Sequence, residues 1–216
     1  MSEELRTLPP AYHQAVEHWQ QHNFPEYPEL SKRWQKHFPK DAEFCLCARI
    51  EKEMPSTIQV GERRGQPKAL VPRELDREAA EQLLMIIRAQ ASTEFGSIQQ
   101  HHGTFERASD VQDQTWVLRV MAEELRHGYQ MIHLLTSADW SSVTDTKPQD
   151  MVEEILSMQT GSHVLAAFNL EYDSFGDSIV FAAFIDRVGK YQLTMQKVNA
   201  YAPMAASMPP MLREEA

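Results

Sequence analysis

Four acidic side chains stand where an amphipathic helix normally carries an apolar residue: Glu94, Glu124, Asp186 and Glu215. Each interrupts a stripe of apolar residues that recurs at the three- and four-residue spacing of one helix face. His127 follows Glu124 by three residues, so these two side chains project in the same direction. Buried carboxylates lose hydration and repel one another, and a shared metal centre is the simplest way to offset both effects.

Helical bundles that bind two metal ions take one acid from each of two helices and a Glu-x-x-His motif from each of the other two. Here Glu94 and Asp186 would be the single acids, and Glu124 with His127 would form the first motif. Glu215 would begin the second motif. Glu94 and Glu124 are 30 residues apart, and Asp186 and Glu215 are 29 apart, so the two halves repeat one layout. Carboxylates combined with imidazole suit iron or manganese.

The second motif needs a His at position 218, and the sequence ends at Ala216. We therefore expect the chain to be part of a longer bundle, truncated at its C-terminal end. Four apolar residues share the faces of the acids and could line a substrate pocket or belong to the core, which spacing alone does not decide. They are Phe95, Ile98, Met121 and Ala182.

Amphipathic helices must position these side chains. Long helices are expected over residues 76–103, 108–137 and 174–200, and a shorter acidic helix over 147–158, because apolar residues recur there near the helical period. Ser109 is the expected N-cap of the second long helix, since acids follow it in the first turn. The order of elements predicts an all-α protein built around a helical bundle.

The two ends of the sequence differ in character from the middle. Residues 1–75 are expected to form a helical and irregular N-terminal extension, and residues 76–216 an incomplete bundle domain. Near the C-terminus, Pro203, Pro209 and Pro210 are expected to break and restart a fourth helical piece.

Composition restricts the classes of partner. The 216 residues carry a net charge of −10 and no basic tract, so we expect neither nucleic acid nor an anionic membrane as a partner. No apolar run approaches the roughly 18 residues that span a bilayer, and the N-terminus lacks the apolar core of a signal peptide. Cys45 and Cys47, separated by one residue, are expected to be free thiols in a reducing cytoplasm.

Several stretches of the sequence resemble one family of bacterial di-iron proteins. They are STEFGSIQQHHG, MAEELRHGYQMIHLL and VLAAFNLEYDSFGDSIVFAAFIDRVGKYQL, and the closing LREEA resembles the start of a Glu-Glu-Ala-His-His helix in that family. The family is the oxygenase subunit of benzoyl-CoA 2,3-epoxidase and, more distantly, the catalytic subunit of phenylacetyl-CoA epoxidase. The resemblance runs from about residue 80 to the end and implies a ferritin-like bundle.

The resemblance also implies a site and an activity. The iron ligands would be Glu94, Glu124, His127, Asp186 and Glu215, holding two iron ions. The protein would use O2 to epoxidise the aromatic ring of an acyl-CoA thioester of the benzoyl-CoA or phenylacetyl-CoA type. Electrons would come from a separate reductase carrying FAD and iron–sulfur clusters, since this chain has no dinucleotide fingerprint and no cluster-binding set of Cys. No residue is assigned a catalytic role.

Two other functions stay open. A non-catalytic ferritin-like scaffold subunit could keep the bundle and bind a catalytic partner. A rubrerythrin-like protein could handle peroxide or iron itself, without an acyl-CoA substrate. The sequence leaves open whether the chain forms homo-oligomers or hetero-oligomers.

Overall fold

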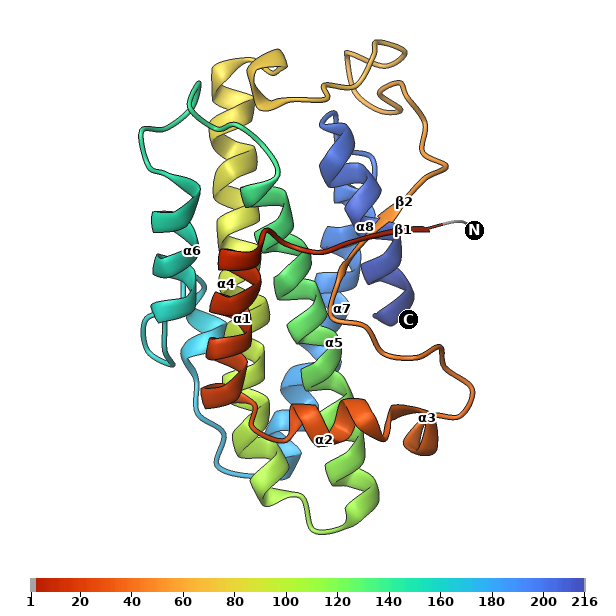
Figure 1. Cartoon of the computed structure of the whole chain (residues 1–216), viewed down its shortest axis with the longest axis vertical. Helices are drawn as coiled ribbons and strands as arrows, with labels where there is room; N and C mark the ends of the chain where they lie inside the picture. The colour runs from red at the N-terminus through yellow and green to blue at the C-terminus, as the bar shows by residue number, and fades with distance from the viewer. Residues whose placement is uncertain (1–2, 216) are drawn as a thin grey trace.

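The computed structural model describes residues 3–215, except for the side chain of Asp186. Helices dominate this part of the chain, and the two strands it contains are short (Figure 1). The prediction of an all-α, ferritin-like bundle is therefore confirmed. Among the described residues, no helix combines the length and the apolar character that a membrane crossing requires.

Two long antiparallel helices, α4 (Arg77–Arg107) and α5 (Val111–Thr136), pack along their length at the centre of the molecule (Figure 1). Asp76 caps α4 by accepting a hydrogen bond from the Ala79 amide at 2.9 Å. The expected cap of α5, Ser109, is wrong by one residue. Asp110 has the extended backbone of an N-cap, and its carboxylate accepts from the Asp113 amide at 2.9 Å.

A second pair of helices, α7 (Phe175–Gln196) and α8 (Ala202–Glu214), packs together and against the central pair. The expected break in α8 is wrong, because Pro209 and Pro210 lie inside a continuous helix. Each proline omits one helical hydrogen bond. Burial of the apolar face of α8 compensates for that loss, since Met204, Met208 and Met211 are buried in the core.

The shorter elements cover the bundle. Helices α1 (Pro10–Asn23) and α6 (Pro148–Ser157) pack on the central pair, and α2 (Tyr27–Lys32) and α3 (Trp34–His37) follow α1. A two-stranded antiparallel sheet, which the sequence did not lead us to expect, pairs β1 (Glu3–Arg6) with β2 (Ala48–Glu51). Strand β2 lies against α8 and α5 and carries Arg49 to the end of α8.

The N-terminal segment contributes to the same apolar core as the bundle. Val16, Trp19 and Phe24 are buried in one cluster with Ile87 and Phe95 of α4, and the rings of Trp19 and Phe95 meet edge to face at 4.7 Å. The domain boundary expected near residue 75 stays a prediction.

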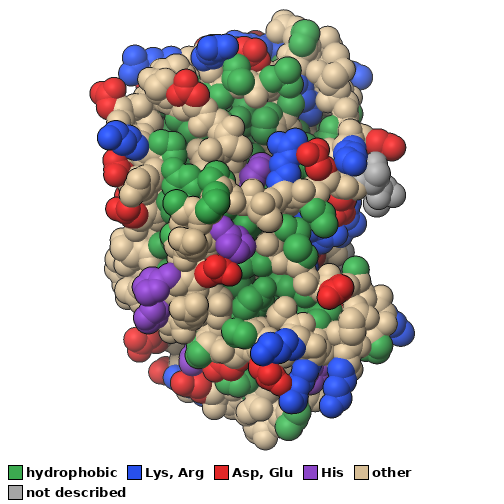
Figure 2. Space-filling view, viewed as in Figure 1, with side chains coloured by type: hydrophobic (Ala, Val, Ile, Leu, Met, Phe, Trp, Pro, Cys, Tyr) green, Lys and Arg blue, Asp and Glu red, His purple; other side chains and the backbone are tan. Residues whose placement is uncertain are grey.

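The surface is mixed in charge. On the face drawn in Figure 2, acidic and basic side chains are interspersed, so the residues described there form no broad basic surface. Cys45 and Cys47 are both free, as their spacing predicts.

Candidate metal centre

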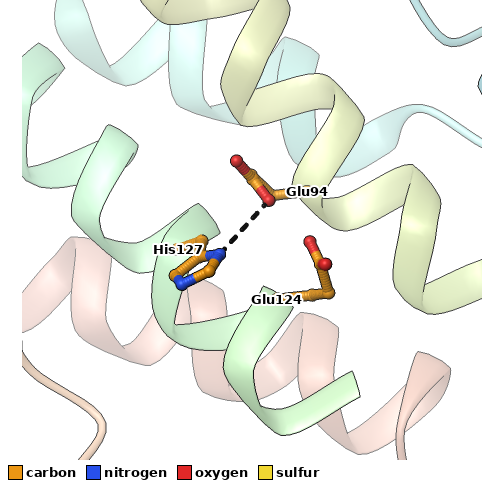
Figure 3. Close-up of side chains that lie close together, drawn as sticks. All are labelled: Glu94, Glu124 and His127. Carbon is orange, nitrogen blue, oxygen red and sulfur yellow. Dashed lines mark ion pairs between the residues drawn. The ribbon is translucent and has the colours of Figure 1, made fainter. Parts of the chain in front are cut away.

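Three of the predicted ligands meet between the two central helices. Glu94 projects from α4, and Glu124 and His127 project from α5 toward it (Figure 3). One atom from each side chain, a carboxylate oxygen or a ring nitrogen, lies within 4.8 Å of the other two. All three residues are buried, with 9%, 8% and 2% of their surface exposed. The i, i+3 spacing on α5 and the antiparallel packing against α4 create this cluster.

The end of α8 brings two further carboxylates to the same imidazole. The carboxylate of Glu214, the last residue of α8, lies 2.9 Å from His127 Nε2. Glu215 follows directly, and its Oε1 lies 3.6 Å from His127 Nδ1. The oxygen of Glu94 nearest to Nδ1 is at 3.7 Å. His127 therefore has one ring nitrogen on Glu214 and the other facing the carboxylates of Glu94 and Glu215.

The ring nitrogen of His127 that faces the predicted ligands, Nδ1, makes no hydrogen bond with the described residues. This nitrogen is also inaccessible to solvent. Buried polar atoms are nearly always satisfied, so an orphaned one calls for an explanation. A metal ion among Glu94, Glu124 and Glu215 would supply the missing partner. Carboxylate oxygens with imidazole are a donor set that suits iron or manganese, so the residues present fit such an ion.

The carboxylates around His127 create an environment that favours a positive charge. Burial by itself would lower the pKa of His127, but the carboxylates of Glu214 and Glu94 raise it well above its ordinary value. Burial likewise would raise the pKa of Glu94, and its contacts with His127 and Glu124 lower it instead. Without a metal ion these carboxylates therefore favour the protonated imidazole, and a metal ion that bound His127 would replace that proton.

Behind the imidazole, two arginines hold Glu214. Arg126 of α5 lies 2.6 Å from its carboxylate, and Arg49 of β2 lies 2.5 Å from it. Burial would raise the pKa of Glu214, and His127 with the two arginines lowers it. Glu214 thus fixes the ring so that Nδ1 faces the other acids, a role that the sequence analysis missed. The available signal was the Glu-Glu pair at 214 and 215, which repeats the pair at 123 and 124.

The remaining predicted ligand is Asp186, which α7 carries. Its side chain lies outside the described residues, so its place in the site stays a prediction from spacing.

A cavity of about 160 Å³ opens beside the cluster. Glu94, Glu124 and Glu215 line one end of it. Three polar residues of α4, Gln90, Thr93 and Ser97, form a second wall. The remaining wall is mostly apolar and comes from α7 and from the irregular segment before it, where the lining residues include Leu165, Ala167, Phe168, Ile185, Val188 and Leu193.

The four apolar residues proposed as either pocket or core belong to the core. Phe95, Ile98 and Met121 are fully buried, Ala182 is 6% exposed, and none of them lines this cavity. They lie beside the acids along their helices, whereas the cavity opens on the side where α7 and its preceding segment face α4.

Comparison with known proteins gives one informative match. No family model matches the chain. The chain is 30% identical over 159 residues to a protein named benzoyl-CoA oxygenase component B, from Aromatoleum evansii. The aligned region covers 74% of this chain and 33% of that protein, so the chain spans about one third of the length of its relative. The geometry of the acids and His127 and this sequence identity agree: the chain is a distant homologue of benzoyl-CoA oxygenase component B.

Proposed function

We propose that the chain forms part of a di-iron monooxygenase that epoxidises the aromatic ring of an acyl-CoA thioester with O2. The observation that carries this proposal is the buried cluster of Glu94, Glu124 and His127, with the Glu215 carboxylate 3.6 Å from His127 Nδ1. The homology to an oxygenase component supports the same reaction class. Benzoyl-CoA is the substrate named for the relative, and a ring of the phenylacetyl-CoA type is kept as an alternative.

In this proposal Glu94, Glu124, His127, Asp186 and Glu215 hold the iron. When bound, the two ions supply the redox chemistry with O2 that no side chain of this protein has. Residues of the chain itself orient the ligands and receive the substrate. Glu214 orients the His127 ring, and the apolar part of the cavity receives the aromatic ring of the substrate.

The electrons would come from a separate reductase component that carries FAD and iron–sulfur clusters. The relative is one component of an oxygenase, which supports the existence of such a partner.

Iron content per chain tests the proposal. The protein is loaded with ferrous iron without oxygen, desalted, and assayed for bound metal. Wild type should retain iron, and Glu94→Ala should lose it, because the variant removes the only acid that α4 contributes to the described cluster. Glu78→Ala, an exposed acid in the first turn of the same helix, is the matched control and should retain iron. Equal iron in the two variants would remove Glu94 from the site.

Turnover then separates the remaining functions. Product formation that requires an aromatic acyl-CoA, O2 and a reductase supports the oxygenase. Peroxide turnover without any dependence on acyl-CoA would favour a rubrerythrin-like protein, and absence of turnover in both assays would favour a scaffold.

A further inference from the structure

The cavity beside the acids has two chemically different ends. Three carboxylates form one end, and mostly apolar side chains of α7 and of residues 165–168 form the other, with polar residues of α4 between them. Val188 and Leu165 both line the cavity and are 52% and 44% exposed, so the cavity reaches the surface between them. A ligand entering there would meet apolar walls before it met the acids.

The size of the cavity limits what can enter. Its volume is about 160 Å³. An apolar protein cavity of about 150 Å³ accepts one benzene ring. The cavity therefore has room for a single six-membered ring.

Phe168 forms part of the apolar wall of this cavity. It belongs to the short 3-10 turn Ala166–Asn169, and its ring packs edge to face against Phe181 of α7 at 5.9 Å. Phe181 in turn contacts the ring of Tyr172 at 5.2 Å. An aromatic ring backed by two others keeps a defined position, as a wall that selects by shape requires.

Polar contacts fix the Phe168 segment on α4. The buried amide of Gln100 donates hydrogen bonds of 2.9 Å to the carbonyls of Ala167 and Leu170, on either side of Phe168. Earlier in the segment, His163 Nε2 lies 2.9 Å from Gln99 Oε1. These contacts fix the irregular segment on α4.

His163 also packs closely on α4. A side chain at Gly96 would place its Cβ about 3.0 Å from the His163 ring, so the glycine permits this approach.

We propose that Phe168 determines substrate specificity by limiting the cavity to one aromatic ring, and that Gln100 is a positioning residue that holds Phe168 in place. The inference rests on the proposed function only in taking the bound ring to be that of the substrate. It adds the residue that would limit the size of the ring, Phe168, and the residue that would hold it in place, Gln100.

Two ring probes test the wall without any need for turnover. Binding of fluorobenzene and of 1-fluoronaphthalene is measured by ¹⁹F NMR titration of the iron-loaded chain. Wild type should bind fluorobenzene at least tenfold more tightly than fluoronaphthalene. Phe168→Ala removes roughly one ring from the wall, and it should improve fluoronaphthalene binding at least tenfold. Phe168→Trp should weaken the binding of fluorobenzene.

The controls separate a specific effect from loss of structure. Leu170→Ala changes an exposed residue of the same segment that does not line the cavity, and it should leave both affinities unchanged. Gln100→Leu should shift the ratio of the two affinities in the same direction as Phe168→Ala, but less. Iron content should equal that of wild type in every variant.

The outcomes distinguish this inference from the proposed function. An unchanged ratio of affinities in Phe168→Ala, or no binding of fluorobenzene to wild type, overturns the inference. Normal ring selection together with no turnover of any aromatic acyl-CoA leaves the inference standing and overturns the proposed function.

Discussion

Replacing Glu214 with Ala should destabilise the metal-free protein severely. Its carboxylate is 9% exposed and lies 2.9 Å from His127 Nε2, 2.6 Å from Arg126 and 2.5 Å from Arg49. The truncation leaves a buried imidazole and two guanidinium groups without their shared acceptor. Removing one partner from a buried ion pair costs about 3–5 kcal/mol. We expect a loss of this size in the free energy of unfolding, measured by urea denaturation at neutral pH without metal.

Two comparison variants show where that loss comes from. Glu214→Gln keeps an oxygen that can accept from His127 but removes the charge, so its loss should be smaller. Glu43→Ala changes an exposed acid near the same arginines and should alter stability by less than about 0.5 kcal/mol. If Glu214→Ala behaved like Glu43→Ala, the reasoning about the buried ion network would be refuted.

A double-mutant cycle isolates the contact between Glu214 and Arg126. Because the two groups touch and are buried, their coupling energy should be about 1–3 kcal/mol. Iron affinity gives an independent reading, since loss of an acid that orients a ligating His weakens metal binding about 10- to 100-fold. Additive effects of the two substitutions, with unchanged iron affinity, would show that Glu214 does not act through this network.

Other predictions test the fold around the site. Asp110→Ala should cost about 1 kcal/mol of unfolding free energy in urea denaturation and Ser109→Ala almost nothing, because only Asp110 caps α5. Burial lowers the pKa of His101 from 6.5 to about 4, so stability is lost as pH falls from 6.5 toward 4, by about 3 kcal/mol in total. His101→Gln should reduce the dependence of the urea midpoint on pH across that range, and the part due to His133 should remain. Gly128→Ala should cost about 1–3 kcal/mol by thermal unfolding, because its Cβ would lie 2.9 Å from the Phe95 ring.

Periodicity alone predicted the elements that carry the acids. An acid on the apolar face of a helix would be buried when that face packs. Its position on the face can be deduced from the spacing of residues in one helix alone. Glu94, Glu124 and His127 could therefore be assigned to one buried cluster before the structure was known. The strands β1 and β2 could not be predicted, because four residues give little periodic signal and they are stabilised by contact with α8 and α5.

The sequence does not show that Glu214 contacts Nε2 of His127 while Glu215 lies near Nδ1. Neighbouring residues on a helix point about 100° apart, so only one of two adjacent acids can face a given partner from the same direction. Which one contacts Nε2 of His127 depends on how α8 rotates about its axis when it packs. Arg49 and Arg126 lie where they attract the carboxylate of Glu214, and they come from β2 and α5. The role of Glu214 is thus decided by three elements that meet only in the folded protein.

The position of the cavity wall depends even more on contacts between segments that are distant in the sequence. Phe168 lies in a segment with no helical or strand period, so no stripe marks it as facing the acids. Its position follows from Gln100, which binds the carbonyls around it, and from Phe181, against which its ring packs. Helix faces are set by local geometry and can be deduced from spacing, and the acids lie on helix faces. The wall that would select a substrate is set by contacts between distant segments, so a change at Gln100 should alter specificity while leaving the acids in place.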